Sequence, residues 1–214
     1  MGISKQQAVQ NREAIIAAAE RLFRDRGVNS VGVNELMDAA GFTRGGFYNH
    51  FKSKDALVAA VVDKAMQDGA ATLDKSVSES KARRRNPLKS HIEGYLSAEH
   101  RGDIEQGCPL SGFIGDVRHL DQPARERYAR GLELNLQHLA DLFAEGGEDP
   151  AQARGKAIAA FSQMAGGLLL ARAVAAADPK LSDEVLSHTR HHLLAPQEET
   201  TRALVGRGRK TKAS

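Results

Sequence analysis

The sequence predicts an all-α fold, and three observations carry that prediction. The chain of 214 residues holds only six prolines and no tryptophan. Alanine and leucine recur at spacings of three and four residues, which is the period of one face of an α-helix. No run alternates β-branched and polar residues as a half-buried strand does. Since 41% of the residues are hydrophobic, the chain has enough apolar side chains to bury a core.

The N-terminal helix is predicted to run from about residue 7 to residue 26. Gly27 follows it directly, and glycine commonly ends a helix because it adopts a positive φ without steric cost. The other face of the segment is charged, so the helix should bury one side only. The apolar stripe consists of Ile15, Ile16, Ala19, Leu22 and Phe23.

Two shorter helices are expected next. Apolar residues at helical spacing predict the first of them over about 33–40, ending at Gly41. Thr43 stands where a hydroxyl side chain can cap the second, which runs to about His50. Helices this short do not stabilise each other against the entropy of ordering, so we expect both to pack on the N-terminal helix.

Ser53 is a further helix cap, and it opens a longer helix that runs to about Leu73 or beyond. The segment that follows is polar, so we place a break near residue 80 and expect the long helix to join two domains. The remaining helices are expected over about 88–100, 110–120, 123–144, 151–177 and 182–194.

Composition excludes several classes of protein. Cys108 is the only cysteine, so the chain forms no internal disulfide and has no cysteine–histidine zinc motif. It has no uninterrupted apolar run of about 18 residues and no secretory segment, so we expect a cytoplasmic protein without a membrane partner. The absence of a nucleophile elbow and of a phosphate-binding loop argues against an enzyme. We therefore predict no cofactor and no metal.

The net charge of +3 is a poor guide to a partner. The last 14 residues carry five basic side chains and no acidic one, so residues 1–200 have a net charge of −2. Binding to DNA must therefore rest on a local arrangement of side chains. We expect residues 196–214 to form a basic, disordered tail.

Such an arrangement lies in residues 33–54, VNELMDAAGFTRGGFYNHFKSK. Two short helices joined by a turn, in front of a third helix, form the pattern of a helix-turn-helix. Gly45 and Gly46 each disfavour a helix interior by about 0.5–1 kcal/mol relative to alanine, yet they let the backbone approach a partner closely. Phe47 and Phe51 lie four residues apart and can face the core together.

The remaining side chains of this segment predict a DNA-reading surface. Arg44 is suited to a bidentate contact with guanine, and Asn49 can read adenine. Lys54 suits a phosphate, because it lies at a helix N-terminus where backbone amides favour an anion. For any one of these residues, a solvated polar face is the alternative. The predicted surface consists of Thr43, Arg44, Gly45, Gly46, Tyr48, Asn49, His50 and Lys54.

These residues closely resemble the DNA-binding domain of the TetR/AcrR family of transcriptional regulators. The resemblance covers residues 12–57 and follows the pattern AGxxxGxxYxHFxxKxxL behind a first helix that ends in FxxxG. It implies a homodimeric, two-domain, all-α regulator that binds a palindromic operator and is usually a repressor released by a small-molecule effector. Family members often have threonine where this chain has Gly32, so the second helix loses a side-chain cap. The matching residues are Phe23, Gly27, Leu36, Ala40, Gly41, Thr43, Gly45, Phe47, Tyr48, His50, Phe51, Lys54 and Leu57.

The resemblance implies a helix-turn-helix domain over residues 1–53, a connecting helix over 54–80, and a ligand-binding and dimerisation domain over 81–195. Dimerisation also has a physical reason, since one helix-turn-helix buries little DNA surface. In the family the last two helices pair across the two-fold axis; the alternative is an internal core helix. The expected interface residues are Phe161, Met164, Gly166, Gly167, Leu168, His188 and His191.

An effector pocket, where present, is expected between the connecting helix and the helices from 88 to 170. Its candidate residues are Tyr95, Cys108, Phe113, Ile114, Tyr128, Leu132, Leu136 and Phe161. Cys108 leaves two interpretations open, a buried inert thiol or a sensor of oxidants or electrophiles. A non-specific architectural DNA-binding protein without a ligand is the other alternative function. The sequence names neither the operator, nor the effector, nor the regulated genes.

Overall fold

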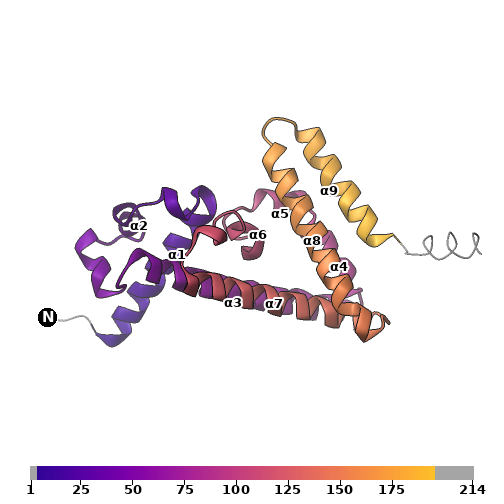
Figure 1. Cartoon of the computed structure of the whole chain (residues 1–214), viewed down its shortest axis with the longest axis horizontal. Helices are drawn as coiled ribbons and strands as arrows, with labels where there is room; N and C mark the ends of the chain where they lie inside the picture. The colour runs from indigo at the N-terminus through magenta and orange to yellow at the C-terminus, as the bar shows by residue number, and fades with distance from the viewer. Residues whose placement is uncertain (1–3, 196–214) are drawn as a thin grey trace, which may run out of the picture.

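The computed structural model describes residues 4–195 and confirms an all-α fold, with no strand in that range. Figure 1 shows a small helical domain at the N-terminal end and a larger helical domain, with one long helix shared between them. The basic segment 196–214, predicted to be a disordered tail, lies outside the described residues.

The N-terminal domain contains the predicted helices in the predicted order, with one difference in helix type and one additional short 3₁₀ helix after the first helix. The φ of 81° at Gly27 ends the first helix, and the φ of 78° at Gly41 forms the turn of the helix-turn-helix. The predicted third helix is a tighter 3₁₀ helix, and the predicted cap is wrong because the Thr43 side chain makes no capping hydrogen bond. Two glycines weaken α-helix formation here, and short segments then adopt the 3₁₀ form. The elements are α1 (Lys5–Arg26), η1 (Val28–Ser30), α2 (Val33–Ala39) and η2 (Arg44–Asn49).

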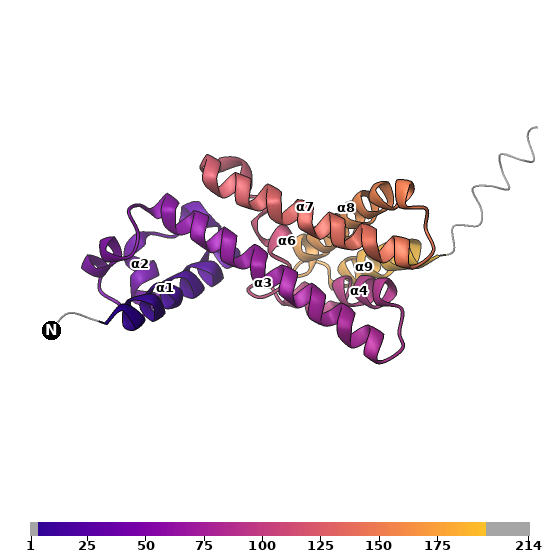
Figure 2. The same ribbon diagram turned by 90° about the horizontal axis from the view of Figure 1, so that it is seen from below.

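The shared helix is α3 (Lys54–Ala82), which runs slightly past the predicted break. Its predicted cap is confirmed, because Ser53 Oγ accepts a hydrogen bond of 3.1 Å from the Ala56 amide. The N-terminal half of α3 packs on α1, and the helix also packs against α4 and α7 of the larger domain (Figure 2). One hydrophobic core therefore extends through both domains.

The larger domain contains more and shorter elements than the sequence predicted. Ser97 caps a new helix inside the expected span 88–100, because its hydroxyl accepts from the His100 amide. The last helix begins earlier than expected, because Asp178 Oδ1 accepts a hydrogen bond of 3.0 Å from the Leu181 amide. The elements are α4 (Pro87–Tyr95), α5 (Ala98–Gly102), α6 (Pro109–Phe113), η3 (Val117–His119), α7 (Gln122–Glu145), α8 (Pro150–Val174) and α9 (Pro179–Leu194).

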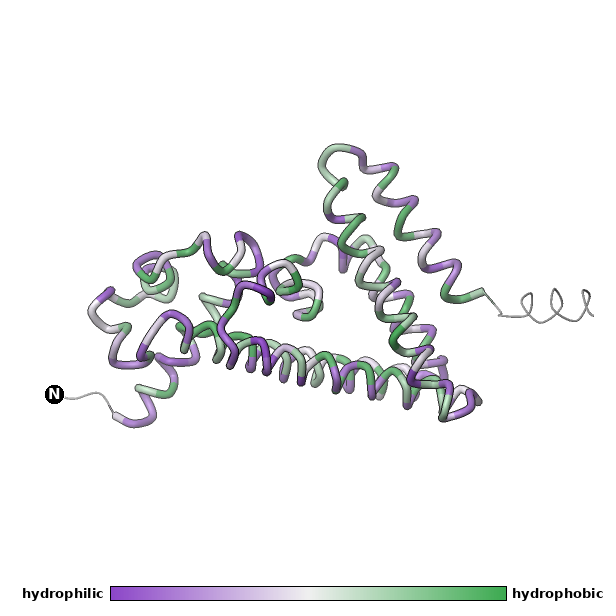
Figure 3. The backbone as a smooth tube through the Cα atoms, viewed as in Figure 1, coloured by the Kyte–Doolittle hydropathy of each residue, from purple (hydrophilic) through white to green (hydrophobic). Residues whose placement is uncertain are grey.

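Three long helices and α9 frame the larger domain. The ion pairs Asp63–Arg127 and Lys81–Glu145 show that α3 and α7 run parallel, side by side. In Figure 1, α8 leaves the C-terminal end of α7 at a steep angle, and α9 folds back along α8. Apolar and polar residues alternate along α3 and α7, as expected for helices that bury one face (Figure 3).

Among the described helices, α8 is long and apolar enough to cross a membrane by length and composition, but core helices of soluble proteins pass the same test. Of its apolar 18-residue stretch, 44% is buried inside the protein, where α8 packs between α7 and α9.

Candidate nucleic-acid interface

The segment η2 has one buried side and one exposed side. Phe47 is completely buried, and its ring centroid lies 5.8 Å from that of Phe51, which is also buried. Tyr48 stands edge-on to Phe47, with ring centroids 5.3 Å apart, but 70% of its surface is exposed. The two buried phenylalanines therefore fix the orientation of η2, and the neighbouring tyrosine projects into solvent.

The structure brings the predicted reading residues together on this exposed side. Thr43, Arg44, Tyr48 and Asn49 are exposed, and His50 is half-buried. Their exposure leaves their donors available to a partner, and their role in DNA contact stays a prediction.

The two glycines of η2 are not required by the fold. An added Cβ at Gly45 would meet no atom within 4 Å, and one at Gly46 would lie 3.6 Å from the Met37 methyl group, an ordinary contact. Both residues have ordinary negative φ values, since neither is among the positive-φ glycines. An exposed backbone without side chains is what a closely approaching partner needs.

Lys54 has an internal role that the sequence did not indicate. Its ammonium donates a hydrogen bond of 2.6 Å to the Val28 carbonyl and lies 5.8 Å from the centroid of the Phe23 ring. Burial lowers the pKa of Lys54, and Asp55 and Asp116 oppose that shift. The side chain thus ties the start of α3 to η1, so a phosphate contact would have to share this ammonium.

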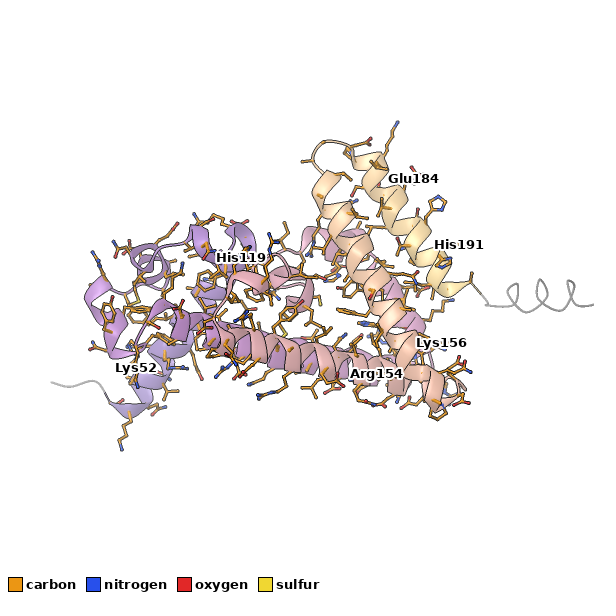
Figure 4. All side chains as sticks on the ribbon, viewed as in Figure 1. Lys52, His119, Arg154, Lys156, Glu184 and His191 are labelled. Atoms are coloured by element: carbon orange, nitrogen blue, oxygen red, sulfur yellow. The ribbon has the colours of Figure 1, made fainter. Side chains whose placement is uncertain are left out.

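Two further basic residues of the same domain were not predicted from the sequence. Lys52 is exposed in the loop between η2 and α3, at the end of the molecule far from α8 and α9 (Figure 4). The Arg12 guanidinium lies 4.7 Å from the centroid of the Phe51 ring. A lysine directly before a helix N-terminus is the signal that could have identified Lys52.

Most of the predicted effector residues lie in the core of the larger domain. Ile114 is 47% exposed, whereas Tyr95 and Phe161 lie in the core with ring centroids 6.1 Å apart. The Tyr95 hydroxyl pairs with Ser111 Oγ at 2.6 Å, and Tyr128 donates to the Leu110 carbonyl. Phe113 and Leu136 are also buried, and Leu132 is half-buried, so these side chains fill the core of the larger domain.

A surface hollow of about 440 Å³ lies instead between α3 and α7. None of the predicted effector residues lines it, so the effector site stays a prediction. Its lining consists of Asp74, Val77, Ser78, Lys81, His138, Asp141, Leu142 and Glu145.

Most of the α8 residues expected at a dimer interface are buried within the protomer. Phe161, Met164 and Leu168 belong to its core, and a Cβ at Gly167 would lie 2.9 Å from Thr189 Oγ1 on α9. Within one chain these residues pack α8 into the core, and their place at a dimer interface stays a prediction. Periodicity missed this because α8 is apolar on several faces, so the sequence did not indicate which stripe is internal.

A different face of α8 and α9 is open. Ile158 and Leu170 on α8 and Leu181 on α9 are exposed apolar side chains. His191, exposed like His188, lies on the side of α9 turned away from α8 in Figure 4.

The structure has a small helical domain that presents an exposed polar segment on a buried aromatic base, and this domain is joined to a second helical domain. This arrangement defines the class of helix-turn-helix transcriptional regulators. Residues 15–61 match the family model described as bacterial regulatory proteins, tetR family. Along nearly its whole length the chain is 27% identical to an uncharacterized HTH-type transcriptional regulator of Mycobacterium tuberculosis, with 89% of this chain and 98% of that protein covered. The N-terminal domain of the chain is therefore a DNA-binding domain of the TetR family of transcriptional regulators.

Other relatives match over shorter segments. The transcriptional repressor DhaR of a Mycobacterium species is 24% identical over 64% of this chain and 67% of its own length. The repressor BepR of Brucella suis is 40% identical, but the match spans only 29% of this chain and 30% of BepR. Among solved structures, the reduced form of Escherichia coli NemR superposes with a TM-score of 0.70 at 20% identity, covering 86% of this chain and 96% of NemR. Because that identity is low, the likeness to NemR shows the fold.

Proposed function

We propose that the chain is a homodimeric repressor that binds a palindromic operator through η2 and leaves it when an effector binds. The observation that carries this proposal is the exposed segment Arg44–Asn49, seated on the fully buried Phe47. A rigid base orients the reading side chains, and the open backbone at Gly45 lets them reach base edges in the major groove.

Arg44 and Asn49 are assigned to base edges, and Tyr48, His50, Lys52 and Lys54 to phosphates. Arginine reads guanine through two parallel hydrogen bonds, whereas lysine and tyrosine donors position the protein on the backbone without reading sequence. The exposure of Arg44 and Asn49 on one short segment supports this division.

A second copy of the chain is the proposed partner of the exposed α8–α9 face. Ile158, Leu170 and Leu181 would be buried there, and Gly166 has no atom within 4 Å of an added Cβ, so a helix of the partner can approach closely. The effect would be to present two η2 segments about 34–36 Å apart, one turn of DNA.

The repressor role is supported by the names of DhaR and BepR. A bound regulator blocks transcription, and an effector that favours another arrangement of the domains would release it.

Arg44→Ala tests the assignment of the reading segment. DNA selected from a random library by the full-length protein should contain two inverted half-sites, as a symmetric dimer requires. We expect the variant to bind that operator about 5- to 150-fold more weakly, since a bidentate base contact contributes about 1–3 kcal/mol, and to tolerate any base pair at one position of each half-site. Fluorescence anisotropy on the operator and on each point variant measures both effects.

Arg130→Ala is the matched control, because it removes the same charge from an exposed position of α7 in the other domain. Unchanged affinity and selectivity in Arg44→Ala would contradict the assignment. Equal wild-type binding to the selected and the scrambled sequence would favour the architectural alternative, and a selected site without inverted repeats would argue against the dimer.

Sensing of oxidants or electrophiles through the Cys108 thiol is the second candidate function. The thiol is half-buried at the start of α6, and the similar NemR structure is that of the reduced form. Arg24 donates a hydrogen bond of 2.8 Å to the carbonyl of Gly107, the residue directly before Cys108.

Reaction of Cys108 with a limiting amount of N-ethylmaleimide tests this candidate. We expect the folded protein to form one thioether, detected by mass spectrometry, and the labelled protein to lose operator affinity. Cys108→Ala should bind the operator normally before and after the treatment. Absence of labelling in the folded protein, with full labelling in urea, would assign Cys108 as an inert core thiol.

A further inference from the structure

The two domains are joined by an arginine as well as by α3. Arg24, near the end of α1, donates hydrogen bonds of 2.5 Å to the Glu105 carbonyl and 2.8 Å to the Gly107 carbonyl. Its side chain is only 2% exposed, and its guanidinium carbon lies 5.8 Å from the centroid of the Phe113 ring. The guanidinium thus reaches from the DNA-binding domain into residues 100–107, which we call the joint loop.

The joint loop is held from its other side by α8. Arg172 donates to the carbonyls of His100, Arg101 and Asp103, at 2.7, 3.1 and 2.9 Å. A Cβ at Gly107 would clash with the Asp103 carbonyl oxygen, so the loop is closed tightly on itself. Two arginines from different domains therefore grip one compact loop, and Figure 1 shows this region, beside α5 and α6, between α1 and α8.

A histidine stiffens the loop further. His100 Nε2 accepts a hydrogen bond of 2.9 Å from the Cys108 amide, and its Nδ1 lies 2.8 Å from the Tyr95 carbonyl oxygen. Together these two contacts need a neutral imidazole that carries its proton on Nδ1. Burial lowers the pKa of His100, which favours that neutral form.

A second contact crosses the same boundary. Asp116 Oδ1 accepts a hydrogen bond of 3.2 Å from the Val28 amide, directly after α1. An added Cβ at Gly27 would lie 3.4 Å from the same oxygen. The end of α1 is thus fixed at two points, by Arg24 and by Asp116.

We propose that Arg24 is a positioning residue, whose grip on the joint loop sets the orientation of the DNA-binding domain relative to α8. This inference rests on the proposed function, because its consequence is the separation of two η2 segments in a dimer. Because α8 belongs to the proposed dimer face, the chain of contacts Arg24–joint loop–Arg172 links the reading domain to the two-fold axis. Without the Arg24 hydrogen bonds, only α3 and the Asp116 contact remain of the connections described here, and the DNA-binding domain can rotate about the end of α3.

The predicted consequence is a change in the preferred spacing of half-sites. The affinity for a single half-site depends on one DNA-binding domain. The additional affinity from binding two half-sites at once depends on how well the spacing of the two domains in the dimer matches the spacing of the half-sites in the DNA. Loss of the Arg24 hydrogen bonds should leave the affinity for a single half-site unchanged. It should reduce the additional affinity that comes from binding two half-sites at once. A residue that only stabilised the fold would not alter the preferred spacing.

Arg24→Met tests the proposal on the full-length protein, since methionine keeps an apolar stem against Phe113 and lacks the donors. Affinities are measured for the selected operator, for a single half-site, and for operators with the half-sites moved one to three base pairs closer or further apart. We expect the variant to bind the operator about tenfold more weakly, to accept several spacings equally, and to bind the half-site like the wild type. A wild-type spacing preference and operator affinity in Arg24→Met would overturn the proposal.

Arg26→Met is the matched control. Arg26 lies two residues away, and its guanidinium pairs with Glu35 of the same domain, so this variant should keep the wild-type spacing preference. If Arg24→Met does not fold, as thermal unfolding would show, Arg172→Met releases the joint loop from α8 and should broaden the spacing preference in the same way; an unchanged preference overturns the proposal. If the wild type itself selects no paired half-sites, the proposed function fails first, and that failure is seen without any variant.

Discussion

Phe47→Ala is expected to lower the free energy of unfolding of the N-terminal domain by about 3–5 kcal/mol and to abolish operator binding. Phe47 is completely buried and forms the base of η2 together with Phe51. Its removal leaves a cavity under a 3₁₀ helix that contains two glycines and has little stability of its own. Urea denaturation followed by circular dichroism measures the loss, and anisotropy on the selected operator measures binding.

Tyr48→Ala separates folding from recognition. Tyr48 follows Phe47 directly and touches its ring, but it is mostly exposed, so its removal should change stability by less than about 1 kcal/mol. Operator affinity should nevertheless fall, since the tyrosine hydroxyl is assigned to a phosphate. A Phe47→Ala protein that remains as stable as the wild type would show that η2 is held by other contacts. A Tyr48→Ala protein with full affinity would remove the tyrosine from the interface.

The sequence predicted helix ends well where a residue adjacent to the helix caps it. Ser53 and Gly27 act through neighbouring backbone groups, so their roles can be recognised from the chain alone. Short elements were less predictable. The sequence indicated one helix over 88–100, but Ser97 interrupts it, and the tertiary contacts of the joint loop determine where the chain turns.

The contacts between the domains could not be predicted from the sequence. Arg24 and Arg172 bind backbone carbonyls, which every residue carries, so no partner residue type signals the interaction. Lys54 shows the same limit, since its acceptor is the Val28 carbonyl. The reading segment was easier to locate, because its side chains face solvent and their chemistry does not depend on distant residues.

The largest pH effect is expected from His91 on α4. Its Nε2 atom is buried without a hydrogen-bond partner, and its ring centroid lies 5.9 Å from that of Tyr95. Burial, with smaller contributions from His138 and His100, lowers the pKa of His91 from 6.5 to about 4. Between pH 6.5 and pH 4, His91 therefore binds a proton in the unfolded chain but not in the folded protein. The free energy of unfolding is consequently highest above pH 6.5 and decreases as the pH is lowered toward 4. A shift of this size corresponds to about 3 kcal/mol over the whole range, of which about 2 kcal/mol is lost by pH 5.

His91→Phe should reduce this acid sensitivity, because phenylalanine keeps a ring against Tyr95 and has no proton to gain. Urea denaturation at pH 7, 6 and 5 should give a wild-type stability that decreases by about 2 kcal/mol more than that of the variant. His188→Gln, at an exposed position of α9, should decrease in parallel with the wild type. The carboxylates titrate in all three proteins, so only the difference between their slopes reports on His91. Equal slopes in wild type and His91→Phe would mean that the imidazole is protonated in the folded state, with water or a carboxylate reaching Nε2.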